Sequence, residues 1–157
     1  MHRQIDQYTQ QHPLAQEIAE LLPLEYRRYA GILQDMVSDY FLSLHWHHYC
    51  ERELGVFASD TYAILARHRD IMPAAAVGFS ERLEQYDLLC LYREWATIER
   101  TLTSIGQRMP RANPLAQAGE ALANHLPQLE SVFHQHYPAM IEFARRQGAE
   151  LMADIED

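Results

Sequence analysis

Two carboxylates lie four residues apart in the apolar stretch GILQDMVSDYFLSLHW (31–46), and no basic residue accompanies them. Residues four apart share one face of an α-helix, so Asp35 and Asp39 would point the same way and repel each other by roughly 0.2–0.5 kcal/mol. A hard divalent cation, manganese or magnesium, would supply the missing positive charge, because such ions prefer oxygen ligands. A stripe of residues exposed to solvent is the alternative, and the spacing alone favours that alternative.

A second pair with this spacing stands at the start of the chain, where His2 and Asp6 flank Arg3. An imidazole and a carboxylate on one helical face can bind a metal ion together. His45 follows the acidic pair of residues 35 and 39 and is the histidine best placed to face it, although packing is the alternative. For the remaining histidines of interest we expect packing or surface positions: His47, His48, His134 and His136.

The basic residues are unusual, because all 13 are arginine and none is lysine. This excludes a Schiff-base lysine and the lysine of a phosphate-binding loop. Arginine is well suited to phosphate recognition, although a bias in genome composition would also produce this pattern. The net charge of −9 argues against general binding of nucleic acid or of an anionic membrane.

The elements that must position these residues are helices, because alternating strand patterns and hairpin dipeptides are nearly absent. We predict one all-α domain over residues 1–157. We expect Ser59 and Asp60 to cap the helix that follows the turn GVFAS, and Asn113 to cap the last helix, with Pro127 and Pro138 bending or dividing it. The predicted helices cover residues 13–23, 26–50, about 60–72, 73–86, 87–109 and 114–147.

The cysteines and the hydropathy indicate where the protein works. Cys50 and Cys90 lie far apart without a metal-type spacing, which is typical of buried thiols in a reducing compartment. No apolar run is long enough to span a membrane, and no signal peptide precedes the first helix. We therefore expect a cytoplasmic protein.

Several segments, taken in order, resemble one known family, the bacterial acyl carrier protein phosphodiesterases, which are distantly similar to HD-domain metal phosphohydrolases. The resemblance covers His2 to about Arg146. The segments that carry it are HRQID (2–6), QDMVSDYFLSLHW (34–46), YREW (92–95), RMPR (108–111) and FHQHYPAM (133–140).

This resemblance implies an HD-domain-like helical bundle and a hydrolase of fatty acid metabolism that removes the 4′-phosphopantetheine arm from holo-acyl carrier protein. It implies a divalent cation, usually manganese, with magnesium possible, and strengthens the assignment of metal ligands (His2, Asp6, Asp35 and Asp39). Arg3 and His45 are the candidate catalytic residues. Since acyl carrier proteins are strongly acidic, the candidate substrate-binding residues are basic: Arg93, Arg108 and Arg111.

Family members begin with a further helical segment, and this chain opens immediately before the HRQID motif. From that departure we expect an incomplete metal site, little activity in this chain, and self-association as a homodimer through an uncovered apolar face around residues 32–44. Two other functions stay open: a helical binding module without catalysis, and an HD-like hydrolase of a nucleotide.

Overall fold

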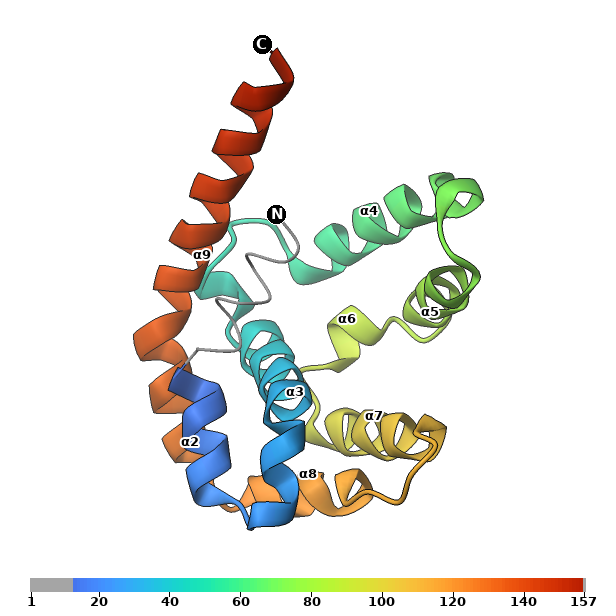
Figure 1. The fold of residues 1–157 in the computed structure, drawn as a ribbon. Coiled ribbons are helices and arrows are strands. Elements are labelled where there is room, and N and C mark those ends of the chain that lie inside the picture. The colour runs from blue at the N-terminus through green and yellow to red at the C-terminus, as the bar shows by residue number, and fades with distance from the viewer. Residues whose placement is uncertain (1–12, 157) are drawn as a thin grey trace. The chain divides into compact units, whose positions relative to one another are not determined.

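A computed structural model of the chain describes residues 13–156, and describes side chains as far as residue 149. Every regular element in this part is a helix, so the all-α prediction is confirmed there (Figure 1). The α-helices are α2 (Pro13–Leu21), α3 (Ala30–Leu44), α4 (Leu54–Arg67), α5 (Ala74–Gln85), α6 (Leu88–Leu91), α7 (Trp95–Arg108), α8 (Leu115–Ala123) and α9 (Leu126–Glu156). Short 3₁₀ helices are η1 (Leu24–Tyr29), η2 (Trp46–His48) and η3 (Arg69–Ile71).

Prolines set several helix boundaries as the sequence predicts. Helix α2 begins at Pro13, α5 begins directly after Pro73, and α7 ends two residues before Pro110. A proline fixes its own φ near the helical value and lacks an N–H, so it fits the first turn of a helix but not the interior. These positions could therefore be read from the sequence alone.

The predicted helix over residues 26–50 is too long. The α-helix covers only Ala30–Leu44, with the 3₁₀ helices η1 and η2 on either side. At the C-terminal end of α3, in η2, the N–H of His48 donates to the carbonyl of His45 at 2.9 Å. This is the i to i+3 hydrogen bond of a 3₁₀ turn. The indole Nε1 of Trp46 holds this turn by donating to the carbonyl of Arg52 at 2.6 Å.

The turn predicted at GVFAS is wrong, because these residues lie inside α4. Ser59 and Asp60 are therefore interior residues rather than caps. The ring of Phe57 packs on Trp46 at 4.7 Å between centroids, and Ala58 is buried. Packing of these apolar side chains outweighs the weak helix propensity of Gly55.

Two other predicted helices are each divided. The segment 87–109 forms α6 and α7, with turns at residues 92–94 between them, and the segment 114–147 forms α8 and α9. The second break precedes Pro127, whose ring would clash with the carbonyl of Ala123 in a continuous helix. Pro138 lies inside α9. Asn113 was predicted to cap the helix that follows it. It lies beside the start of α8, where its Oδ1 accepts a hydrogen bond from the N–H of Leu115 at 3.2 Å.

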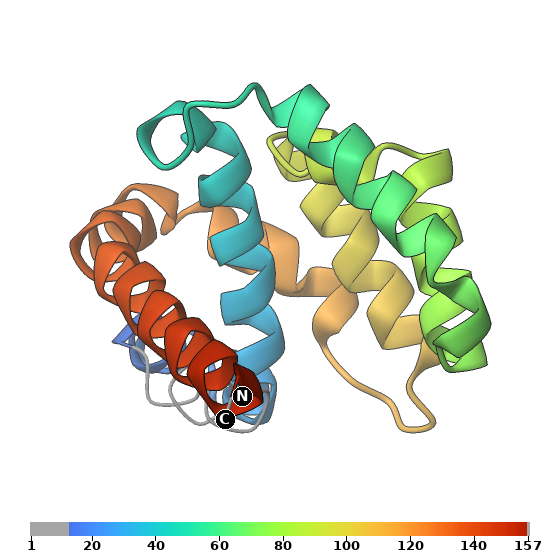
Figure 2. The same cartoon turned by 90° about the horizontal axis from the view of Figure 1, so that it is seen from above.

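The chain forms two units, which we describe separately. The first unit comprises the chain up to Val37 and from Glu99 onward, and α2 packs along α9 within it (Figures 1 and 2). In this unit α8 approaches α7 closely, because a Cβ at Gly119 would lie 3.2 Å from the Cα of Glu99. Its fully buried side chains form a large apolar core: Leu14, Ile18, Leu33, Val37, Leu102, Leu115, Leu122, Leu129 and Phe133.

The second unit comprises Ser38–Ile98, with α4, α5 and α6 packed on one another (Figure 2). Its helices enclose a small cluster of Ala58, Tyr62 and Leu83. The hydroxyl of Ser43 on α3 donates to the carbonyl of Leu89 at 3.3 Å. A search of the described part of the chain found no helix with the length and apolar character needed to cross a membrane.

Candidate metal centre

The acidic pair lies on α3 as predicted, four residues apart on one helix. Asp35 is exposed and Asp39 is half-buried. Both residues take part in an interaction within the structure, so neither Asp35 nor Asp39 is without a partner. The argument that a cation must answer two unpaired charges therefore loses its force. The predicted ligand role itself stays a prediction that rests on the spacing and the resemblance.

Between these aspartates stands Ser38, whose Oγ is buried and has no hydrogen-bond partner among the described residues. A serine inside a helix usually donates to the carbonyl four residues earlier or points to solvent. A buried hydroxyl that does neither retains its capacity for one more polar contact. This part of α3 is therefore compatible with a polar ligand beside Asp39.

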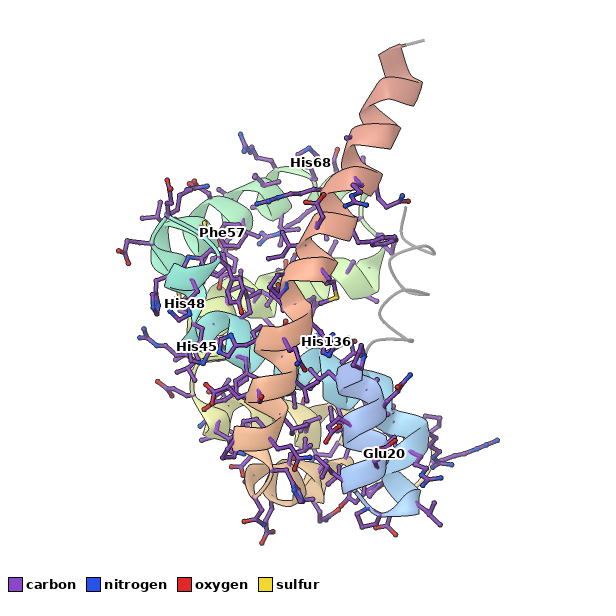
Figure 3. The ribbon with its side chains drawn as sticks, turned by 90° about the vertical axis from the view of Figure 1, so that its left-hand side faces the viewer. Glu20, His45, His48, Phe57, His68 and His136 are labelled. Carbon is purple, nitrogen blue, oxygen red and sulfur yellow. The ribbon has the colours of Figure 1, made fainter. Side chains whose placement is uncertain are left out.

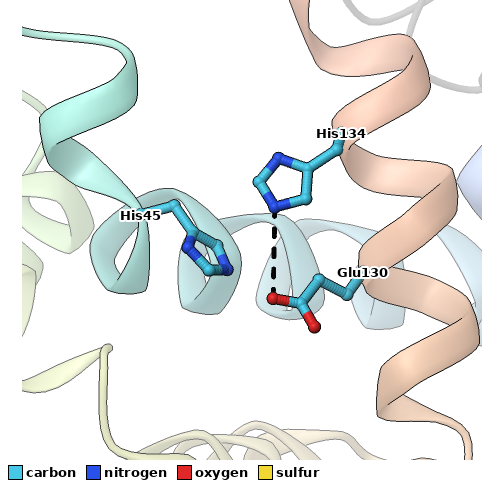
Figure 4. Close-up of side chains that lie close together, drawn as sticks. All are labelled: His45, Glu130 and His134. Carbon is cyan, nitrogen blue, oxygen red and sulfur yellow. Dashed lines mark ion pairs between the residues drawn. The ribbon is translucent and has the colours of Figure 1, made fainter.

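A second pair of donors, which the sequence analysis did not single out as a pair, lies on α9. Nε2 of His134 is 4.0 Å from Oε1 of Glu130, one helical turn away, and both side chains are half-buried (Figure 4). The neighbouring Phe133 is buried and stacks on Tyr137 with 4.5 Å between ring centroids. Phe133 also meets the His134 ring edge-on at 5.6 Å, which limits the positions of the imidazole.

The Glu130–His134 pair fits a divalent cation by its chemistry and nearly by its spacing. Two ligands in neighbouring positions around one ion, with bonds of about 2.1 Å, lie about 3 Å apart. The observed 4.0 Å would have to shorten by about 1 Å. As an ion pair at this distance and exposure, the two residues would contribute at most about 1 kcal/mol to the free energy of unfolding. These donors are compatible with a divalent cation, and they do not distinguish manganese from other ions.

His45 lies in the second unit, at the residue before η2. His45 and His48 lie on one side of this turn. A 3₁₀ helix has three residues per turn, so positions three apart lie above one another. The two rings stack with 5.7 Å between centroids, and His47 lies 4.0 Å from His48 (Figure 3). On its other side the His45 ring stacks on Phe41 at 6.4 Å.

The other predicted site residues are distributed as follows. Arg108 ends α7 and Arg111 lies in the loop after it, both exposed in the first unit. Arg93 is exposed in the second unit and lies outside α7, so the three arginines do not come from one helix and its exit loop. His2, Arg3 and Asp6 fall outside the described residues.

The surroundings of Cys90 do not activate its thiol as a nucleophile. Both thiols are free and half-buried. Burial, followed by a hydrogen bond to Asp87, raises the pKa of the Cys90 thiol, which keeps it protonated at neutral pH. The same aspartate has φ of 47° and accepts from the Tyr62 hydroxyl at 3.0 Å. This group is consistent with a structural role.

Sequence reasoning missed Glu130 and the exposed Arg28 on η1. The signal for Glu130 was present as a glutamate four residues before a histidine, but such spacing is common on solvated helices. For Arg28 the signal was the pair RR at 27–28, which could not be related to Arg111 before the fold was known.

Comparison with known proteins agrees with the resemblance noted in the sequence. The family model described as acyl carrier protein phosphodiesterase matches residues 1–140. A protein of that name from Enterobacter sp. (strain 638) is 35% identical over 146 residues, covering 92% of this chain and 76% of the relative. Its namesake from Photorhabdus laumondii subsp. laumondii is 30% identical over 145 residues, covering 92% and 73%.

A third namesake, from Salmonella agona (strain SL483), is 32% identical over 149 residues, covering 94% of this chain and 77% of the relative. No solved structure matches the chain, so the expected likeness to HD-domain proteins stays a prediction. The match to the family model and the identity to these relatives extend over most of the sequence. The chain therefore belongs to the acyl carrier protein phosphodiesterase family.

Proposed function

We propose that this protein hydrolyses the phosphodiester that joins 4′-phosphopantetheine to a serine of holo-acyl carrier protein, giving the apo form. The observation that carries the proposal is the family match over residues 1–140. The names of relatives that are 30–35% identical over most of the chain support it. The alternative of a non-catalytic module has no comparable support.

A divalent cation, manganese by preference and magnesium as the alternative, is part of the proposal. When bound, such an ion would supply the positive charge that polarises a phosphoryl oxygen and activates water. Two ligand sets are in competition. The predicted set is His2, Asp6, Asp35 and Asp39, whereas the pair Glu130 and His134 is supported by its donor types and its 4.0 Å separation.

The protein's own residues would orient the substrate and move the proton. Planar guanidinium groups bind two phosphate oxygens at once, so Arg3 is the candidate for the non-bridging oxygens, whereas Arg108 and Arg111 are candidates for contact with the carrier protein itself. An imidazole can accept and donate a proton, so His45 is the candidate for transferring a proton to the leaving serine oxygen.

Two further parts of the proposal concern the setting of the protein. Free thiols are typical of a reducing compartment, which supports the cytoplasm. A homodimer also stays a proposal, but α3 does not support it as expected. The apolar residues of this helix, among them Leu33, Val37 and Phe41, are buried within the chain, and only Leu44 is largely exposed. Sedimentation equilibrium of the 18.3 kDa chain tests this part.

The decisive experiment incubates holo-acyl carrier protein with this protein and Mn²⁺ or Mg²⁺, and follows the intact mass of the carrier protein. We expect loss of the phosphopantetheine mass, and no loss when EDTA is added; such a loss would also overturn the sequence-based expectation of little activity. Unchanged mass with both ions, accompanied by hydrolysis of a nucleotide in a parallel panel, would replace the proposal with the nucleotide hydrolase.

The same assay, combined with calorimetric titration of Mn²⁺, decides between the ligand sets. One variant carries Asp35→Asn and Asp39→Asn, and the other carries Glu130→Gln and His134→Ala. The set that holds the ion loses at least about tenfold in affinity, because an interaction of 1.4 kcal/mol corresponds to a factor of ten. His45→Ala removes the imidazole of that residue. It shows whether His45 contributes to binding of Mn²⁺ or to turnover of the carrier protein alone. Full affinity in all three variants would contradict both sets.

A further inference from the structure

A small pocket of about 530 Å³ opens in the first unit, between η1 and the loop that joins α7 to α8. It is lined by apolar and charged groups: Leu24, Glu25, Arg28, Ala112, Asn113 and Pro114. Leu24 stands at this pocket with 72% of its surface exposed, the only largely exposed aliphatic side chain described in this unit. The Leu24 side chain is therefore available for contact with a partner at this pocket.

Arg28 is held in place on the wall of this pocket. Its Cζ lies 4.6 Å from the centroid of the buried Tyr29 ring, and its guanidinium also donates to the Tyr29 hydroxyl. A further donor of the same group points to the carbonyl of Ala112 at 3.5 Å, across to the loop. A planar guanidinium has five N–H donors, so these contacts leave donors for an incoming carboxylate.

The loop side of the pocket is held by Asn113. Its Nδ2 donates to the carbonyls of Gly106, at 2.9 Å, and Arg111, at 3.0 Å. A Cβ at Gly106 would lie 2.7 Å from Oδ1 of Asn113. A side chain at position 106 would therefore displace the Asn113 amide. Arg111 and Ala112 are therefore fixed relative to the end of α7, where Arg108 donates to the carbonyl of Ser104 at 3.1 Å.

Three exposed arginines lie on η1 and on the segment that runs from the end of α7 into the following loop. Arg28, Arg108 and Arg111 are exposed, and none forms an ion pair with a carboxylate of the described residues. Arg52 and Arg69 are instead paired with Asp60 and Glu84. Glu25 is the one carboxylate among the residues that line the pocket, Arg28 lines it too, and Arg111 directly precedes the lining residue Ala112, so positive groups gather here in a chain of net charge −9.

We propose that this surface, formed by Leu24, Arg28, Arg108 and Arg111, docks an acidic helical face of the carrier protein. The proposal rests on the proposed function, because the carrier protein is the partner which that function requires. Carboxylates of the partner would meet the three arginines, and an apolar side chain of the partner would enter the pocket beside Leu24. Charge complementarity of this kind mainly raises the association rate and fixes the orientation of the complex.

The test measures binding and turnover of carrier protein by Arg28→Glu, Arg111→Glu and Leu24→Ala. Arg145→Glu, which reverses an exposed arginine on α9, is the matched control. We expect Kd and KM for carrier protein to rise roughly tenfold in each charge reversal, with kcat within about twofold. Charges at the edge of an interface mainly change the rate at which the two proteins associate and leave the chemical step unaffected. The effect should shrink as salt rises toward 1 M, where the screening length is about 3 Å. The control should change neither constant.

Among the described residues the Arg111 side chain has no hydrogen bond or ion pair, so Arg111→Glu remains informative if Arg28→Glu unfolds, which circular dichroism would show. Equal Kd for carrier protein in Arg111→Glu and in the unmutated protein would overturn the proposal. Titration with inorganic phosphate adds a second check. If Arg28→Glu and Arg111→Glu lose phosphate binding but keep carrier-protein binding, the surface is a simple anion site and the proposal is wrong.

Failure of this proposal can be distinguished from failure of the proposed function. Binding of apo-carrier protein, which lacks the phosphopantetheine arm, tests the surface even if no hydrolysis occurs. Normal turnover of holo-carrier protein with unaltered constants in the variants would retain the function and remove the docking surface.

Discussion

The two units of the chain differ in how they bury apolar side chains. The first encloses many aliphatic and aromatic residues with no exposed surface, from Leu14 to Phe133. The second rests on the small cluster around Ala58, Tyr62 and Leu83, and it carries six of the seven large hydrophobic side chains that are exposed among the described residues. Regions with few buried apolar contacts open at lower free energy than well-packed cores. We infer that the first unit is the more stable of the two.

Truncating one core leucine in each unit should show the largest effect. Leu129→Ala removes a fully buried side chain from α9, and we expect a loss of about 4 kcal/mol of unfolding free energy, in the upper range for such changes. Leu83→Ala in α5 should cost about 2 kcal/mol, because the smaller cluster can collapse around the missing atoms. Denaturant unfolding measures the change in the free energy of global unfolding in each variant. Native-state hydrogen exchange shows which backbone amides lose protection. Equal losses in both variants would contradict the comparison.

An intermediate effect is expected at the contact between α7 and α8. Gly119→Ala places a methyl group 2.5 Å from Cγ of Glu99 and 3.2 Å from its Cα, so the helices must separate slightly. We expect a loss of about 1–3 kcal/mol, typical of overpacking. The matched control, Gly31→Ala on α3, meets no atom within 4 Å and should stabilise by about 0.5–1 kcal/mol. Thermal unfolding of both variants would show the opposite signs, and a shared sign would refute this account of the contact.

The smallest effect is expected at Tyr62, which donates to Asp87 and accepts from the N–H of Leu89 at 3.1 Å. Tyr62→Phe should cost about 1 kcal/mol near pH 7, mostly in the second unit, through the lost hydrogen bonds. Burial raises the pKa of the Tyr62 hydroxyl above the usual value of 10.0. A raised folded-state pKa means that this contribution is complete below pH 10 and decreases as the pH rises further. Unfolding measured from pH 7 to 11 should therefore show a smaller alkaline loss in Tyr62→Phe than in the unmutated protein.

The helical fold could largely be predicted from the sequence, because proline positions and apolar periodicity are local signals. The errors occur where contacts between distant residues decide. Residues 54–58 are helical because Phe57 packs on Trp46. No pattern in the neighbouring sequence predicts that contact. The candidate site shows the same division. The spacing of Asp35 and Asp39 was visible, whereas the roles of Glu130 and Arg28 depend on burial and on neighbours that only the fold supplies.

Pro138 gives the metal-binding proposal a mechanical aspect. It stands one turn after His134 inside α9, and without an N–H it cannot form the helical hydrogen bond to the carbonyl of that histidine. The backbone around His134 is therefore less stiff in bending than an uninterrupted helix, and bends of this kind are characteristic of proline. Glu130 and His134 both precede this missing bond, so bending here would move the rest of α9 relative to the pair and leave the backbone between the two residues unchanged. The approach of about 1 Å that an ion requires would therefore come from rotation of the two side chains.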